Sequence, residues 1–235
     1  SNNKFLFKIS DKFKILDYKI KSSLNINELS VRNNIDLKNI FPNFSSETKF
    51  NNRQIEMIVK KDYFLIDGNG EFLIQKNYDK ASYKIEKKKD THSFDIKLDF
   101  INNYVNLDLL DYKSDSKSEM SLYLNGKFFK DKTLNLEKIE FKNGSDLIII
   151  KKLKLSNDFK ISDVKSATFN FTDSKNIKNI FKIKNNKDDY TISGKVYNAS
   201  KLIEDLIFED SKNKVRSHVH HPERHHHQHK RPATT

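Results

Sequence analysis

Apolar and polar side chains alternate with a period of two along most of the first 196 residues. In the stretch FDIKLDF at 94–100, the apolar residues share one side and the charged residues share the other. This alternation is typical of antiparallel strands that have one apolar and one hydrated face. We therefore predict a succession of strands. Similar segments occur at 18–26, 55–59, 63–66, 119–129, 147–155, 159–171 and 190–196.

Short segments with Asn and Gly separate the predicted strands. DGNG at 67–70 and the NG pairs at 125–126 and 143–144 favour hairpin turns, because these residues adopt positive φ readily. The pair at 125–126 is also compatible with a bulge inside one long strand. Charged segments, which we expect to be flexible connections, occur at 87–90, 114–118 and 185–189.

About a dozen such strands in series predict a mainly β fold. Open twisted sheets rarely exceed ~10 strands without curling or splitting. We therefore expect a long antiparallel meander that is curled into an open groove or an elongated β-sandwich-like gutter. Two outcomes remain open. The sheet closes around its own side chains, or its apolar face stays partly exposed and marks a binding surface.

The stretch 189–207 predicts a strand followed by one short C-terminal amphipathic helix. Apolar residues at 202, 203, 206 and 207 have helical spacing, and they follow Asn198, whose side chain suits an N-cap. Gly194 in the strand permits a bend or a close backbone approach. A simple end cap over the last strands is an alternative role for this helix. We also expect a helical turn near residues 174–180.

The chain divides into two regions of different composition. Residues 1–214 are expected to form a single curled β-sheet domain, a fragment of a longer protein. Residues 215–235 contain seven of the eight histidines and few apolar residues, so we expect a disordered tail of vector-derived or frame-shifted origin. His225, His226 and His227 would bind metal ions adventitiously, and no native metal site is expected.

The net charge of +12 raises the question of a nucleic-acid partner. Before Val215 the positive charge is almost entirely lysine, with arginine only at Arg32 and Arg53. Arginine provides most of the forked contacts to phosphate and guanine, so this composition argues against a nucleic-acid binder. The lysines are expected to lie mainly on hydrated faces.

Candidate catalytic groups are scarce. The chain has no cysteine, and His92 is the only histidine before residue 215, in a segment predicted to be a solvated turn. Nucleophilic catalysis needs a base with an orienting partner, and none is evident. The pair Asp95 and Asp99 is expected to belong to a hydrated strand face. We therefore predict a protein that is not an enzyme and uses no cofactor.

The segment Ile192-Ser193-Gly194, followed by Asn198 through Leu206, resembles a recurring strand–helix unit of AsmA-like proteins, particularly the YhdP-type members. Where that family is expected to have Asp at the helix cap, this chain has Asn198, which keeps the capping chemistry without the charge. The repeated amphipathic strands over residues 14–196 are similar to the long β-groove of the family.

This resemblance implies a non-enzymatic protein of the Gram-negative cell envelope. It implies an inner-membrane anchor outside this chain, a location on the periplasmic face, and a β-groove for phospholipid acyl chains that serves intermembrane lipid transport or outer-membrane assembly. Moving a lipid requires a continuous apolar lining, worth roughly 0.8 kcal/mol per sheltered CH₂. The expected lining residues are Phe94, Ile96, Leu98, Phe100, Met120, Leu122, Leu124, Phe169 and Phe171.

Other readings predict the same alternation of residues. The nine lining residues would pack in the same pattern inside the closed core of a structural or adhesive β domain. A lipopolysaccharide-binding envelope protein with an open β fold is a further alternative. A dry, open apolar face would favour lipid, and a filled interior would favour the structural role.

Overall fold

The computed structural model describes residues 1–198 apart from 35, 102, 115–118, 158–159 and 187–188. These residues form one compact unit. The helix predicted after Asn198 and the His-rich tail, including His225, His226 and His227, lie outside the described residues.

In the described part of the chain, twelve strands form one large antiparallel sheet, and two short strands pair separately. Period-two alternation explains why these segments are extended, since it gives each strand one apolar and one polar side. The elements are β1 (Asn2–Ile9), β2 (Ile15–Arg32), β3 (Glu47–Lys60), β4 (Tyr63–Leu73), β5 (Asp79–Lys88), β6 (Thr91–Phe100), β7 (Asn106–Leu107), the 3-10 turn η1 (Asp108–Leu110), β8 (Tyr112–Lys113), β9 (Met120–Phe129), β10 (Leu134–Asn143), β11 (Asp146–Leu155), β12 (Ile161–Thr172), β13 (Lys178–Asn185) and β14 (Tyr190–Val196).

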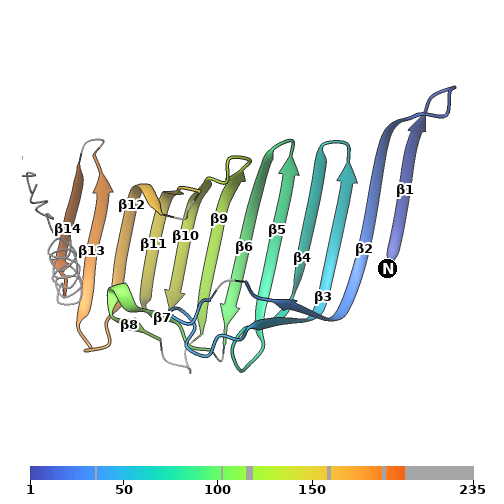
Figure 1. The fold of residues 1–235 in the computed structure, drawn as a ribbon. Coiled ribbons are helices and arrows are strands. Elements are labelled where there is room, and N and C mark those ends of the chain that lie inside the picture. The colour runs from blue at the N-terminus through green and yellow to red at the C-terminus, as the bar shows by residue number, and fades with distance from the viewer. Residues whose placement is uncertain (35, 102, 115–118, 158–159, 187–188, 199–235) are drawn as a thin grey trace, which may run out of the picture. The chain divides into compact units, whose positions relative to one another are not determined.

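Each strand of the large sheet pairs with its neighbours in sequence, and β6 pairs with β9. Figure 1 shows this meander, with β1 at one edge and β14 at the other. The sheet is not closed, because β1 and β14 do not pair with each other. The predicted mainly β meander of about a dozen strands is therefore confirmed.

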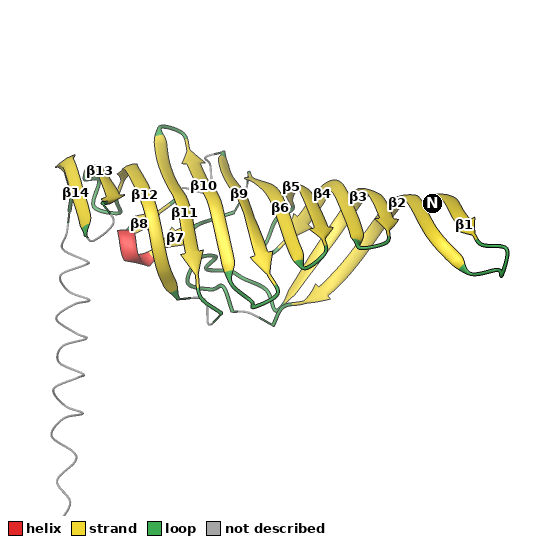
Figure 2. Ribbon diagram, turned by 90° about the horizontal axis from the view of Figure 1, so that it is seen from above, coloured by secondary structure: helices red, strands yellow, loops and turns green. Residues whose placement is uncertain are grey.

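Two connections run across one face of the sheet near one end of its strands. They are the described residues of 33–46 between β2 and β3, without 35, and those of 101–114, without 102, which contain β7, η1 and β8. Figure 2 shows η1, β7 and β8 on one side of the sheet. We call these two segments the cover. The backbone N–H of Asn106 donates to the carbonyl of Ile40 at 2.8 Å, which joins one segment to the other.

Two of the three Asn/Gly segments predicted to be hairpin turns lie inside strands. DGNG at 67–70 is inside β4 and is not a turn, because Gly68 and Gly70 leave room for side chains from the neighbouring strands: a Cβ on Gly68 would lie 2.6 Å from the Tyr83 ring. Asn125-Gly126 is inside β9, opposite a register shift in β10, so the bulge alternative describes it better than a turn. The turn at Asn143-Gly144 is confirmed, with a φ of 55° at Gly144.

The helical turn predicted near residues 174–180 is wrong. Residues 173–177 form a non-helical turn, in which the Asp173 carboxylate accepts the backbone N–H groups of Lys175 and Ile177, and β13 follows from Lys178. Asx turns of this type compete with helix formation. The 3-10 turn η1 was not predicted. Of residues 87–90, expected to be a flexible connection, the first two end β5 and the last two make a tight turn, across which Lys88 pairs with Thr91.

Candidate functional site

The nine residues predicted to line a groove all lie on one face of the sheet, here called the apolar face. Residues that face each other on neighbouring antiparallel strands point to the same side. Between β6 and β9 the register pairs Phe100 with Met120, Leu98 with Leu122 and Ile96 with Leu124, and it places Phe94 opposite Gly126. From Leu122 the row continues through Phe141 and Ile148 to Phe169 of β12, where Phe171 is on the same side.

Burial divides these nine residues into two groups. Four belong to the buried core cluster: Phe100, Met120, Phe169 and Phe171. The other five, Phe94, Ile96, Leu98, Leu122 and Leu124, are half-buried. Leu98 and Leu122 pack against the border of the cluster. The apolar face therefore has a covered end and an open end, and the predicted lining extends over both.

Aromatic side chains of the cover close the covered end. The Phe41 ring centre of the cover lies 5.7 Å from that of Phe100, which also meets Phe72 of β4 edge-on at 5.8 Å. Tyr112 is 1% exposed and meets the rings of Phe141 and Phe171 edge-on at 5.7 and 5.8 Å. Such edge-to-face contacts are favourable geometries for buried rings. The cover thus continues the hydrophobic core outward from the sheet.

A buried carboxylate attaches the cover to the sheet. Asp79, at the start of β5, is 1% exposed, and it accepts the backbone N–H of Ile101 at 2.8 Å and a hydrogen bond from the Asn103 amide. Beside it, the Gln75 amide donates to the carbonyl of Tyr104 at 2.7 Å. Buried polar groups of this kind are retained only when they are hydrogen-bonded, so these contacts fix the positions of Ile101, Asn103 and Tyr104.

A second attachment joins the cover to the turn between β12 and β13. The Ser174 backbone N–H and hydroxyl donate to the Asp111 carbonyl at 2.8 Å and to its carboxylate at 2.7 Å. In the same turn, Asp173 is buried. Desolvation raises the pKa of Asp173, but hydrogen bonds from Asn198, Ile177, Asn179 and Lys175 outweigh it and hold the pKa below its usual value.

Gly194 makes the close backbone approach that its sequence position suggested. A Cβ at this position would lie 2.4 Å from the Ile180 carbonyl oxygen and 2.7 Å from the Phe181 Cβ. The Asn198 backbone N–H donates to Asn179 Oδ1, and its side-chain amide donates to Asp173 Oδ2 at 2.9 Å. The helix that Asn198 is predicted to cap lies outside the described residues, so the cap remains a prediction.

Arg53 places a positive charge on the apolar face. β3 has a register irregularity between Asn51 and Gln54, and Arg53 faces Ile26 of β2. Its guanidinium carbon lies 4.2 Å from the Phe50 ring centre and 4.8 Å from that of Tyr83. These are cation–π distances. Burial raises the pKa of the Tyr83 phenol, and the neighbouring Arg53 charge lowers it by less, so the phenol is neutral near pH 7.

The opposite face of the sheet is hydrated and charged. Glu140 forms ion pairs with Lys138 at 2.5 Å and Lys142 at 2.6 Å, and the hydrogen bonds from these lysines lower its pKa. Asp95 accepts hydrogen bonds from the Tyr123 hydroxyl at 2.6 Å and from the Asn125 amide at 3.1 Å. Asp95 therefore belongs to a polar strand network on this face, as the alternation predicts.

Candidate catalytic and metal-binding groups are not clustered in the described part of the chain. His92 lies inside β6, half-buried, with its ring centre 6.5 Å from that of Phe128. The prediction of a solvated turn histidine is therefore wrong, because β6 begins one residue earlier, at Thr91. Among the described residues, no three His, Cys, Asp or Glu side chains are grouped to hold a metal ion, and no helix is both long and apolar enough to cross a membrane.

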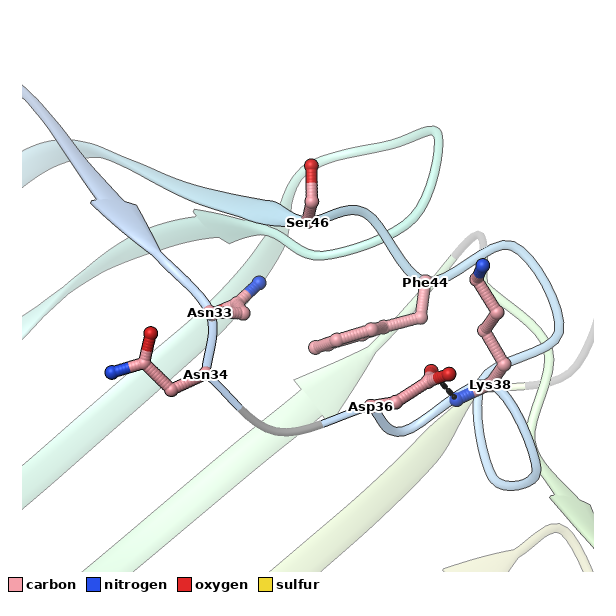
Figure 3. A pocket seen from close by; sticks show the side chains of 6 residues that line it. All are labelled: Asn33, Asn34, Asp36, Lys38, Phe44 and Ser46. Atoms are coloured by element: carbon pink, nitrogen blue, oxygen red, sulfur yellow. Dashed lines mark hydrogen bonds between the residues drawn. The ribbon is translucent and has the colours of Figure 1, made fainter.

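One pocket of about 410 Å³ lies where the cover begins (Figure 3). The Phe44 ring is in its centre, and the Asp36 carboxylate accepts the backbone N–H of Lys38 at 3.0 Å (Figure 3). Its remaining lining residues are Asn33, Asn34 and Ser46. The pocket has a mixed polar lining and one carboxylate that already has a partner, so it has no evident catalytic arrangement.

Sequence reasoning did not identify the cover or Arg53 as parts of this face. A signal for the cover exists in FPNF at 41–44, where the one proline of residues 1–214 disfavours a central strand and two aromatic residues lie outside the alternating segments. Arg53 lies just before the alternating segment 55–59, and this position is the sequence feature that indicates its place on the same strand. Comparison with family models, curated proteins and solved structures gives no significant match. The AsmA-like resemblance therefore remains a prediction.

Proposed function

We propose that the apolar face binds lipid acyl chains, in a non-enzymatic cell-envelope segment that takes part in intermembrane lipid transport or outer-membrane assembly. The observation that carries this proposal is the open end of the face, where Phe94, Ile96 and Leu124 form one contiguous apolar surface beside a filled core. A surface of this kind that is not covered by its own chain suits an apolar ligand. Each methylene sheltered there contributes roughly 0.8 kcal/mol.

The proposal also includes a groove, which forms where the sheet curls toward its apolar face. A right-handed twist accumulates across twelve strands, and twisted open sheets of this size tend to curl. Curling toward the apolar face would shelter a chain on two sides. Arg53 favours an acidic amphiphile as the ligand, because a guanidinium stacked between Phe50 and Tyr83 offers its edge to a carboxylate or phosphate.

The test is native mass spectrometry of the protein purified from bacterial membranes. We expect co-purified phospholipid on the unchanged chain, and its loss in Ile96→Asp and Leu124→Asp. Both substitutions place a charge on the open end, away from the buried cluster, so the variants should still fold. Ser121→Asp adds the same charge to the opposite face and should keep the lipid. A lipid-free unchanged protein, or equal loss in all three variants, would refute acyl-chain binding.

The cover favours a second candidate, a structural or adhesive β domain with a closed core. Phe41 and Tyr112 already fill one end of the apolar face in the manner of a core. Under this reading the nine residues stabilise the fold and bind nothing. The same experiment distinguishes the two, since a structural domain gives an apo mass even under gentle conditions.

The cellular setting is proposed from the resemblance alone. A periplasmic location at the inner membrane, with an anchor in a segment outside this chain, is what an AsmA-like protein would require. Lipopolysaccharide remains an alternative ligand because it also offers acyl chains and phosphates. The mass of the co-purified ligand would separate it from phospholipid.

A further inference from the structure

The hairpin turns whose residues are all described differ in charge between the two ends of the strands. The turns β1–β2, β3–β4, β5–β6 and β9–β10 all lie at the end away from the cover (Figure 1). Each of these four turns, taken with the strand ends beside it, carries two or three lysines and one aspartate. We call their exposed lysines the lysine rim: Lys12, Lys14, Lys60, Lys61, Lys87, Lys88, Lys89, Lys130 and Lys132. At the opposite end, the described connections carry about as many acidic as basic residues.

The rim is an ordered row of charge. Successive turns are separated by two strand spacings, or about 10 Å, which is close to the Debye length at physiological salt, so their potentials overlap. The backbone N–H of Lys89 donates to the Asp62 carbonyl at 3.0 Å, which links two of the turns directly. Lys88 is partly neutralised by Glu86 at 3.1 Å.

The first turn of the rim also presents apolar side chains to solvent. Phe13 is 90% exposed, at the tip of the β1–β2 hairpin, and Ile9, Ile15 and Leu16 beside it are all more than half exposed. The tip is held by hydrogen bonds from the Phe13 N–H to the Ser10 carbonyl and from the Ser10 N–H to the Lys14 carbonyl. An aromatic side chain in an ordered turn among lysines is typical of a site that inserts into an anionic bilayer interface.

We propose that the lysine rim and Phe13 dock this domain on the surface of an anionic phospholipid bilayer. The bilayer is favoured over nucleic acid because the rim has exposed aliphatic and aromatic side chains and no arginine. This docking concerns the turns and is independent of whether the apolar face holds an acyl chain. If native mass spectrometry shows no bound lipid, docking on vesicles is still expected. If it shows bound lipid, that binding does not require the rim lysines.

Vesicle co-sedimentation of the full chain tests the proposal, at about pH 8, where histidines with a pKa near 6.5 are neutral. We expect binding to phosphatidylcholine vesicles that contain phosphatidylglycerol, and little binding to phosphatidylcholine alone. Lys61→Ser, Lys89→Ser and Lys132→Ser together should weaken binding on the order of a hundredfold. The matched variant, with Lys38→Ser, Lys76→Ser and Lys175→Ser at the opposite end, has the same net charge and should bind nearly as well as the unchanged chain.

Phe13→Asn examines the apolar contribution. Phe13 has a φ of 55°, which Asn adopts more readily than Phe, so the variant keeps the turn and removes only the ring. We expect a loss of binding of several fold, and no loss for Ile177→Asn at the opposite end. Equal weakening by the two triple-lysine variants would overturn the proposal. It would also fail if single-stranded DNA bound as tightly as the vesicles and Phe13→Asn had no effect, since the rim would then be a general polyanion site.

Discussion

The covered and open ends of the apolar face have the same strand pattern but different surroundings. Phe94 and Phe100 are six residues apart on β6, point to the same side and belong to the same alternation, yet Phe100 is 1% exposed and Phe94 is half-buried. The difference comes from the cover, which supplies Phe41 against Phe100. A strand pattern therefore specifies which face is apolar, and the connections determine how much of that face is a core.

The largest effect is expected from replacing these two phenylalanines separately. Phe100→Ala should reduce the free energy of unfolding by about 3–5 kcal/mol, because it leaves a cavity between Phe41 and Phe72. Phe94→Ala should cost roughly half of that or less, since water and neighbouring side chains can occupy the space. Urea unfolding followed by circular dichroism measures both values.

The same pair of variants can contradict the comparison. Equal losses for Phe94→Ala and Phe100→Ala would mean that the open end is packed as tightly as the covered end in solution. The open apolar surface, on which the proposed ligand site depends, would then not exist.

A smaller effect is expected from releasing the cover. Asp79→Ala removes the acceptor of the Ile101 N–H and one of the two acceptors of the buried Asn103 amide, which also donates to the Asn77 carbonyl, and should cost about 1–3 kcal/mol. Hydrogen exchange should accelerate first at residues 101 and 103–105. Asp99→Ala is the control, because it removes only a surface ion pair with Lys97 and should cost below about 1 kcal/mol. Unchanged exchange in the cover of Asp79→Ala would show that its attachment lies elsewhere.

Much of the sheet was accessible from the sequence because alternation is a local signal. The pattern of 94–100 gave the direction of each side chain, and the register confirms that all nine predicted lining residues share a face. The break at 67–70 was misread for a physical reason. Gly68 and Gly70 have the composition of a turn, but they serve the packing of Tyr83 and Arg53 from neighbouring strands, which only the tertiary structure specifies.

The cover was not predicted because its contacts are distant in sequence. Phe41 packs on Phe100, and Tyr112 packs on Phe171, without any periodic pattern in their own segments. The same holds for the charge of the turns. The net charge of +12 suggested dispersed hydrated lysines, but antiparallel pairing collects the lysines of four separate turns at one end of the strands. These lysines form a row because of where their turns lie in the meander, which the composition alone does not specify.

The smallest effect near neutral pH is expected from Tyr112→Phe, and its sign should depend on pH. Burial raises the pKa of Tyr112 to about 12; a hydrogen bond from Asn143 lowers it, and the nearby Asp146 raises it. The variant loses the 2.7 Å hydrogen bond from the Asn143 amide, which should cost about 0.5–1.5 kcal/mol near pH 8.

At higher pH this cost should shrink and then reverse. The unfolded chain ionises Tyr112 near pH 10, whereas the folded chain resists ionisation until about pH 12. Between these values the unchanged protein loses stability as the pH rises, by about 1.4 kcal/mol for each unit, and the phenylalanine variant is spared this loss. Urea unfolding of both proteins from about pH 8 to 12 measures the difference, with Tyr104→Phe as the control on a tyrosine that is 45% exposed. A constant difference across this range would mean that the phenol ionises as it does in water. Tyr112 would then not be sealed between the cover and the sheet, and the covered end would be as accessible to solvent as the open one.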